Sequence, residues 1–183
     1  MFNEVGVTPG TKYTFGDWKK YAIHDDKNIK GFFGKYRWMS NFHECSVMHA
    51  GLMYPSSENA YQAAKVIFGD RHKLQRCTAR ESKFVWKTCK RIDGSAAEWD
   101  ARKYLVMSEI LTDKFNRNAD LAQKLIDTGV RYLEETNHWG DRWWGVDIHE
   151  GGQNNLGKLL MEIREWWMAQ VAMEDNLNEE NHL

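Results

Sequence analysis

The stretch YPSSENAYQAAK, residues 54–65, predicts the first helix of a mainly helical chain. Its Pro-Ser-Ser beginning is a typical helix start, and Glu58 in the first turn suits the positive end of the helix dipole. One face of that helix would carry four polar side chains, at spacings i, i+3, i+4 and i+7: Glu58, Tyr61, Gln62 and Lys65. The face spans two turns, roughly 10 Å, so a sugar-sized ligand could lie between its carboxylate and its amine. Taken alone, the pattern favours a solvated helix face instead.

The chain beyond this stretch predicts further helices and one strand. Ser95 followed by Glu98 forms a capping box ahead of a long helix that ends near Phe115. The apolar stripe of that helix would be Tyr104, Met107, Leu111 and Phe115. Asn118 is expected to cap a helix that stops near Gly129, and Val130–Glu135 is a candidate strand. The last helix begins near Asn155 and would bury Leu156, Leu160, Ile163 and Trp167.

The N-terminal part of the chain is different in character. Residues 11–54 are rich in aromatic side chains, are broken by glycines, and predict short strands at Tyr13–Phe15, Ile29–Phe33 and Ser46–Met53. The fold class is therefore mainly α, or α+β with a small β element near the N-terminus, in a single compact domain. We expect an N-terminal extension at residues 1–30 packed on or near the domain, the domain itself at 31–172, and an acidic flexible tail at 173–183.

The composition is that of an ordinary soluble protein. The 183 residues are 42% apolar and 28% charged, which suits one domain with a real core. No run approaches the ~20 apolar residues that span a bilayer, and the first ten residues lack the features of a signal peptide, so we expect a cytoplasmic protein without membrane contact. Cys45, Cys77 and Cys89 indicate small buried thiols rather than disulfides. Because the histidines are scattered, we expect no bound metal. Because the sequence has no phosphate-binding glycine motif, we expect no bound redox cofactor.

One segment is strongly basic. From Arg71 to Arg91 the chain has eight Lys or Arg residues and a single acid, Glu81. Such a segment could meet the phosphates of a nucleotide or of a nucleic acid. If the segment were one continuous helix, one face would carry Arg76, Arg80, Lys83, Lys87 and Lys90. A solvated basic face is the simpler interpretation.

The loop Thr136–Gln153 is a second candidate region. A loop of that length in a compact domain is usually functional. It contains Trp144, Gly145 and Asp147 shortly before a helix start. A Trp ring offers a surface on which a base can stack, and the free N–H groups of a helix N-terminus can bind an anion. The alternative is that the tryptophans only cover the core.

Taken in order, these segments resemble the NADAR family, also called YbiA-like. The matching pieces are Met39–Phe42, Tyr54–Lys65, Trp99 followed by Met107, Trp144-Gly145, and Asn154–Arg164. They extend from about Phe32 to Trp167, most of the chain. The resemblance implies a mainly helical fold, N-glycosidase activity, and a ligand pocket in which Glu58 and Lys65 match the acid and the lysine of the helix motif.

The resemblance also implies the other site residues. Those expected to bind the substrate are Asn41, Phe42, Tyr61, Gln62, Trp99, Trp144, Gly145 and Asn154. Asp147 is a third catalytic candidate whose role stays open, because many relatives place an acid directly after the Trp-Gly pair and here Val146 stands there. Two substrate classes are associated with the family: ADP-ribose on the exocyclic amine of guanine, as in antitoxins that counter an ADP-ribosyltransferase toxin, and phosphorylated, ribosylated intermediates of riboflavin synthesis. A non-catalytic module that binds ADP-ribose or NAD would have the same pocket.

Both substrate classes join a ribose to an exocyclic nitrogen. Breaking that bond needs an acid for the departing nitrogen and a base for water, and Glu58 is the candidate for that work. A neutral Lys65 could instead attack the sugar carbon and form a Schiff base. That route requires burial to lower the pKa of the lysine, and the loop around Trp144 could supply the burial. A charged Lys65 would only hold a phosphate or a hydroxyl.

Overall fold

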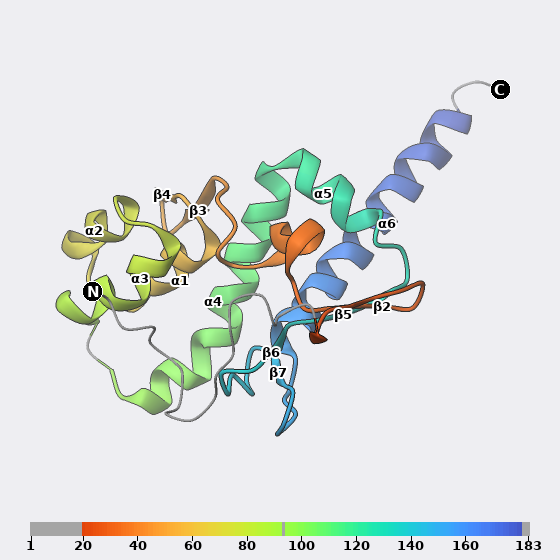
Figure 1. Ribbon diagram of the computed structural model, residues 1–183. Helices are drawn as coiled ribbons and strands as arrows, with labels where there is room; N and C mark the ends of the chain where they lie inside the picture. Colours follow the sequence, from red (N-terminus) through yellow and green to blue (C-terminus); the bar gives the residue numbers. More distant parts are fainter. Residues whose placement is uncertain (1–19, 93, 181–183) are drawn as a thin grey trace. The chain divides into compact units, whose positions relative to one another are not determined.

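The computed structural model describes residues 20–92 and 94–180, and it is mainly α-helical with a few short strands, as the sequence predicts. Figure 1 shows the helices and strands, coloured along the sequence. The described chain divides into two units. Unit 1 consists of residues 20–37 and 130–161, and unit 2 consists of residues 38–129 and those from 162 onward. No helix within these residues is both long and apolar enough to cross a membrane.

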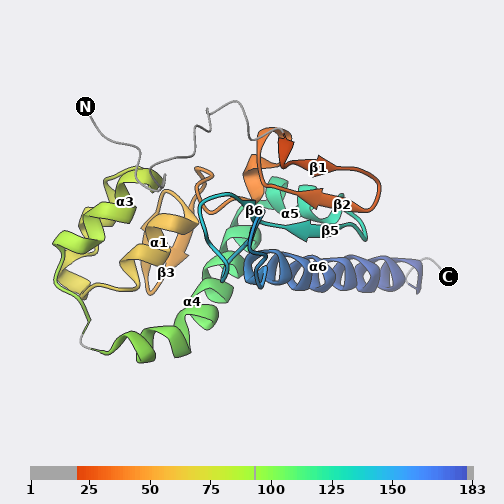
Figure 2. The ribbon, with the colours of Figure 1, turned by 60° about the horizontal axis from the view of Figure 1, so that its bottom comes forward.

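Unit 2 contains most of the helices. Its elements are the hairpin β3 (Val47–His49) and β4 (Leu52–Tyr54), the helices α1 (Ser57–Ala63), α2 (His72–Gln75), α3 (Ala79–Val85), α4 (Ala96–Arg117) and α5 (Ala119–Ile126), and the 3-10 turns η3 (Phe68–Asp70) and η4 (Trp86–Thr88). Helix α1 packs against α3, α4 and the hairpin. Figure 2 shows α1 between α3 and β3. This central position is what buries the helix predicted from residues 54–65.

Helix α4 forms the core of unit 2. Ser95 and Glu98 make the predicted capping box, in which each side chain bonds the backbone N–H of the other. Met107, Leu111 and Phe115 are buried as predicted, whereas Tyr104 is only half-buried. Lys114 on the same helix is fully buried, and its ammonium donates hydrogen bonds to the carbonyls of Trp38 (2.7 Å) and Ser40 (3.1 Å). Those bonds fix the chain that leads to Asn41.

Unit 1 is built on a three-stranded sheet. Strand β2 (Asn28–Lys30) pairs antiparallel with β1 (Ile23–His24) and parallel with β5 (Tyr132–Glu134), and Figure 2 shows the three strands in one layer. Ile29 lies opposite Leu133, and both are fully buried. The predicted long loop contains a second small sheet, in which β6 (Thr136–Asn137) pairs parallel with β7 (Val146–Asp147). The 3-10 turn η2 (Gly34–Met39) and helix α6 (Asn155–Glu180) each have residues in both units.

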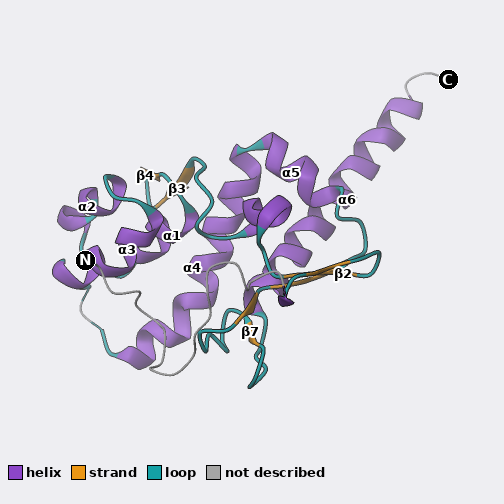
Figure 3. Ribbon diagram, in the orientation of Figure 1, coloured by secondary structure: helices purple, strands orange, loops and turns teal. Residues whose placement is uncertain are grey.

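Several expected elements differ in the structure (Figure 3). The strand expected at Ser46–Met53 is the β3–β4 hairpin, because Ala50 and Gly51 adopt positive φ angles and turn the chain. The basic segment is not one helix, since α2 ends at Gln75 and a new capping box starts α3. The side chain of Asn118 does not cap α5 but donates to the carbonyls of Ser46 and Lys114.

The two ends of the chain bear on the remaining expectations. The strand expected at Tyr13–Phe15 lies outside the described residues. Helix α6 starts at Asn155, as predicted, and buries Leu156, Leu160 and Ile163, while Trp167 is half-buried. The helix continues to Glu180, so the segment from residue 173 begins inside it. The flexibility of that acidic end stays a prediction.

Candidate functional site

Helix α1 carries the centre of the site. Ser56 caps it by accepting a hydrogen bond from the Asn59 N–H, and the Asn59 amide donates to the carbonyls of Leu74 (2.7 Å) and Cys77 (2.8 Å). These bonds tie the start of α1 to the end of α2. Every residue of α1 is buried. The simpler interpretation from sequence, a solvated helix face, is therefore wrong.

Two side chains of α1 and one from the turn that follows it form a hydrogen-bonded row. The Nε2 of Gln62 donates to Oε1 of Glu58 at 2.7 Å, and the Nζ of Lys65 donates to Oε1 of Gln62 at 2.7 Å. Glu58 is 6% exposed and Gln62 is 5% exposed. The structure thus brings these predicted side chains together, with the carboxylate and the amine at opposite ends of a shared amide. The helix is shorter than expected, because it ends at Ala63, and Lys65 lies in the turn that follows it.

Aromatic rings surround the amine of Lys65. Its Nζ lies 4.7 Å from the ring centre of Tyr61, 4.7 Å from that of Trp86 and 5.3 Å from that of Trp99. We call these three rings the aromatic cage. Tyr61 and Trp99 were expected at the site from sequence, but Trp86 was not, and its only signal was an aromatic residue inside the basic segment. Within unit 2, these three rings bury Lys65, whereas the Trp144 loop, which the sequence allowed as a source of burial, belongs to unit 1.

The charge state of Lys65 follows from this environment. Burial lowers its pKa to about 8, although the Glu58 carboxylate opposes the shift by favouring the ammonium. The positive charges of Lys83, Arg91 and Lys103 lower the pKa further. The Schiff-base route requires that burial lowers the pKa of Lys65. The sequence left this open, and in the structure burial does lower that pKa.

A pocket of about 310 Å³ opens beside Lys65 in unit 2. Its lining residues are Lys65, Trp86, Arg91, Ile92, Gly94, Ser95, Glu98, Trp99 and Arg102. The guanidinium of Arg91 lies 5.5 Å from the Trp86 ring centre, and that of Arg102 lies 5.0 Å from the Trp99 ring centre. Arg102 also donates to the Ala64 carbonyl at the end of α1, at 2.9 Å. Flat rings beside two guanidinium groups are suited to a base and to phosphates.

Asn41 and Phe42 lie close to this centre in unit 2. The carbonyl of Asn41 accepts from the backbone N–H of Glu58 at 2.9 Å, and the Asn41 side chain is buried. Its Oδ1 has no hydrogen-bond partner within the described structure. A buried amide oxygen in that state is a suitable acceptor for a substrate N–H or O–H group. Phe42 is half-buried, and the Lys83 ammonium lies 5.4 Å from its ring centre.

Asp147 and Asn154 belong to unit 1 and are engaged there. One oxygen of Asp147 accepts from the N–H of Gly140, and the other accepts from those of His149 and Glu150. Burial pushes the pKa of Asp147 upward, but these N–H donors outweigh it and hold the pKa below its ordinary value. Asp147 therefore organises its loop.

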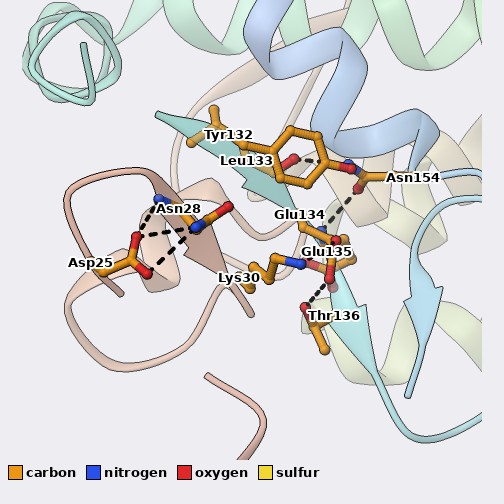
Figure 4. Close-up of polar contacts among 9 residues, drawn as sticks. All are labelled: Asp25, Asn28, Lys30, Tyr132, Leu133, Glu134, Glu135, Thr136 and Asn154. Atoms are coloured by element: carbon orange, nitrogen blue, oxygen red, sulfur yellow. Dashed lines mark hydrogen bonds and ion pairs between the residues drawn. The ribbon is translucent and has the colours of Figure 1, made fainter. Parts of the chain in front are cut away.

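The amide of Asn154 likewise joins two segments of unit 1. It accepts from the N–H of Glu135 and donates to the Leu133 carbonyl and the Tyr132 hydroxyl, as Figure 4 shows. Beside it, Lys30, Glu134 and Thr136 form a separate polar row. Asn154 adopts a φ of 54°, which this bonding supports.

Trp144 and Gly145 precede β7 in unit 1. Trp144 is half-buried, and its N–H donates to the Asp141 carboxylate at 2.9 Å. A Cβ at position 145 would lie 2.3 Å from the Glu135 carbonyl oxygen, so only glycine fits there. As for metals, the described residues contain no group of three or more His, Cys, Asp or Glu side chains able to hold an ion.

The fold agrees with comparisons against known proteins. The NADAR domain family model matches residues 25–167, starting earlier than the Phe32 expected from the resemblance, and the match includes residues of both units. The chain belongs to the NADAR family. It is 32% identical over 146 residues to the N-glycosidase YbiA of Escherichia coli, covering 76% of this chain and 84% of that protein.

Two further comparisons extend this result. The NMR structure of the Escherichia coli protein YbiA matches with a TM-score of 0.66 and 29% identity, covering 85% of this chain and 90% of that one. A riboflavin biosynthesis protein of Vibrio vulnificus is 33% identical over 133 residues, which are 70% of this chain and 35% of that protein. The chain thus spans about a third of the Vibrio relative.

Proposed function

We propose that this protein removes ADP-ribose from ADP-ribosylated guanine, in DNA or in a nucleotide, by hydrolysing the bond between the ribose and the exocyclic amine. As a NADAR protein whose relatives include proteins named N-glycosidases, the chain is a hydrolase that acts on N-glycosyl bonds. The choice of ADP-ribosylated guanine as the substrate is our own step beyond that class.

The observation that carries the proposal is the amine of Lys65 at the edge of an arginine-lined pocket. With a pKa of about 8, roughly a quarter of the Lys65 side chains are neutral at pH 7.5. An ordinary lysine would be neutral in only about one molecule in a thousand at that pH. Lys65 is therefore a competent nucleophile under physiological conditions, and the two Trp rings can hold a base beside it.

The chemistry then proceeds in two stages. The ribosylamine opens to an imine, and the neutral Nζ of Lys65 adds to the sugar carbon. The bond between that carbon and the guanine nitrogen breaks, the nitrogen takes up a proton and leaves as the free amine, and a Schiff base joins Lys65 to the sugar. Water adds to the Schiff base, which releases the sugar and regenerates the amine. Glu58 is assigned the proton transfers, because it is buried and the Gln62 amide links it to Lys65.

The pocket supports ADP-ribose over a smaller phosphosugar. Two guanidinium groups, those of Arg91 and Arg102, line it together with two indole rings. ADP-ribose carries two phosphates and an adenine ring, which match both kinds of group. A phosphoribosyl intermediate carries one phosphate.

The second candidate is hydrolysis of the phosphorylated riboflavin intermediates. It is favoured by the Vibrio vulnificus relative, which is named a riboflavin biosynthesis protein. The same Lys65 and Glu58 chemistry applies, because the sugar is again joined to an exocyclic amine. A module that only binds ADP-ribose or NAD is disfavoured, since simple binding has no use for a lysine with a lowered pKa.

A direct assay separates these functions. The pure protein is incubated with an ADP-ribosyl-guanine oligonucleotide and, separately, with the riboflavin intermediates, and released base and sugar are followed by mass spectrometry. We expect turnover of the oligonucleotide to be faster, and Lys65→Arg to abolish it. Turnover of the riboflavin intermediates alone would establish the second candidate. Tight ADP-ribose binding without turnover of either substrate would establish the binding module.

A further inference from the structure

Gln62 lies between the carboxylate of Glu58 on α1 and the amine of Lys65 in the turn after the helix. Its amide donates to Glu58 on one side and accepts from Lys65 on the other, both at 2.7 Å, and it is 5% exposed. Among the described residues, no carboxylate forms an ion pair with Lys65, and the Gln62 oxygen accepts the hydrogen bond of its Nζ. A neutral amide therefore occupies the place where a carboxylate would form an ion pair with the lysine.

We propose that Gln62 is a positioning residue, which holds the amine of Lys65 for attack and keeps that amine from pairing directly with a carboxylate. The inference rests on the proposed role of Lys65 as the nucleophile. It assigns to Gln62 a function through Lys65 instead of the contact with the substrate expected from sequence.

The orientation of the amide supports this role. An ionised carboxylate only accepts hydrogen bonds, so the NH₂ end of Gln62 must face Glu58 and its oxygen must face Lys65. An amide oxygen accepts from an ammonium and from a neutral amine alike. The Nζ is therefore held in place in both protonation states, while its remaining directions face the aromatic cage and the pocket.

The other charged groups around Lys65 leave its pKa sensitive to the residue at position 62. Those facing it are Glu58 on α1, Lys83 on α3, Arg91 after η4 and Lys103 on α4, and Glu98 and Arg102 line the same pocket. Among the charges of described residues that act on its pKa, Glu58 favours the ammonium and the three cations oppose it. A carboxylate in direct contact with the Nζ would favour it far more, because an opposite charge at hydrogen-bond distance in a buried site raises the pKa of a lysine.

The test measures the titration of Lys65 without any substrate. Trace labelling by acetic anhydride across pH, read by peptide mass spectrometry with exposed Lys158 as the internal reference, gives the pH at which Lys65 becomes reactive. The variants are Gln62→Glu and Gln62→Met. The matched control is Gln123→Glu, because Gln123 on α5 also donates to a carboxylate four residues away, at an exposed position.

We expect Gln62→Glu to move the titration of Lys65 upward by at least about one pH unit, so that labelling at pH 7.5 falls about tenfold. Gln62→Met should leave the titration at or below its wild-type pH and should lower kcat more than it raises KM, because the amine is no longer held. Gln123→Glu should change neither. If Gln62→Glu does not fold, the Gln62→Met result alone decides.

Three results would overturn the inference. The first is a Lys65 that titrates at the same pH in the wild type and in Gln62→Glu. The other two concern Gln62→Met: a titration of Lys65 that moves upward, or an unchanged kcat. Because the labelling needs no substrate, the expected shifts without turnover of any N-ribosyl substrate would contradict the proposed function. They would still support the part of the inference that concerns the charge state of Lys65.

Discussion

Glu58 is buried at the start of α1 and faces the row that ends at Lys65. We predict that Glu58→Gln lowers kcat by at least about a hundredfold, the usual lower range for losing a general acid or base. The affinity for ADP-ribose should change far less, because the amide has the same shape. Single-turnover kinetics and calorimetry on one preparation measure both. A variant that binds normally and turns over near the wild-type rate would remove Glu58 from the mechanism.

The lowered pKa of Lys65 predicts how the rate of turnover depends on pH. Its pKa is lowered by burial to about 8, so the amine is protonated and inactive below that pH and neutral above it. The rate should therefore rise about tenfold per pH unit up to pH 7 and level off above pH 8. Borohydride added during turnover should leave the sugar on Lys65. A flat profile from pH 6 to 9 together with no trapped adduct would leave Lys65 as a binding residue.

The basic segment, residues 71–91, would contact the phosphate backbone if the protein binds a DNA strand directly. Arg80 and Lys87 are exposed, and Arg91 belongs to the pocket. We predict that changing Arg80 and Lys87 to Glu slows turnover of an oligonucleotide and flattens its salt dependence, because contacts to a phosphate backbone weaken steeply with salt.

Two comparisons control that experiment. Turnover of ADP-ribosylated GMP by the same double variant should change much less, because a nucleotide has no strand to contact. Changing the exposed Lys124 and Lys158 to Glu should affect neither substrate. An equal loss on oligonucleotide and nucleotide would mean that the segment serves the pocket only.

At the scale of elements, local signals were predictable and packing was not. The capping box of α4, the polar face of α1 and the start of α6 follow from spacings of a few residues. Trp86 could not be found in this way, because its place in the aromatic cage depends on how η4 packs against Lys65. Asn118 stands at the N-cap position of α5, as predicted, but its side chain does not cap the helix, since its amide bonds Ser46, a residue far away in sequence.

In unit 1, the backbone of Glu135 passes so close to Gly145 that a larger residue does not fit there. A Cβ at Gly145 would lie 2.3 Å from the Glu135 carbonyl, whereas one at Gly69 would meet nothing within 4 Å. We predict that Gly145→Ala lowers the free energy of unfolding by about 1–3 kcal/mol, the usual cost of overpacking. Gly69→Ala should leave it nearly unchanged. Chemical denaturation of both variants measures the difference, and equal midpoints would show that the loop has room to move.

For the whole molecule, we predict that EDTA leaves the activity intact. The described residues hold no cluster with the ligand set of a metal, and the proposed chemistry uses an amine and a carboxylate. The assay compares initial rates with and without the chelator. A loss of activity that one particular divalent ion restores would contradict the prediction.

The aromatic cage around Lys65 also has a consequence for inhibitor design. An aryl aldehyde with a neighbouring hydroxyl group forms a reversible covalent bond with a neutral amine but hardly reacts with an ammonium ion. Such a warhead would select Lys65 over the exposed lysines of the chain, and its ring would stack on Trp86 and Trp99. An acidic substituent aimed at Arg91 or Arg102 would add affinity from the same pocket. The residue proposed as the nucleophile would thus also be a selective point of covalent attack.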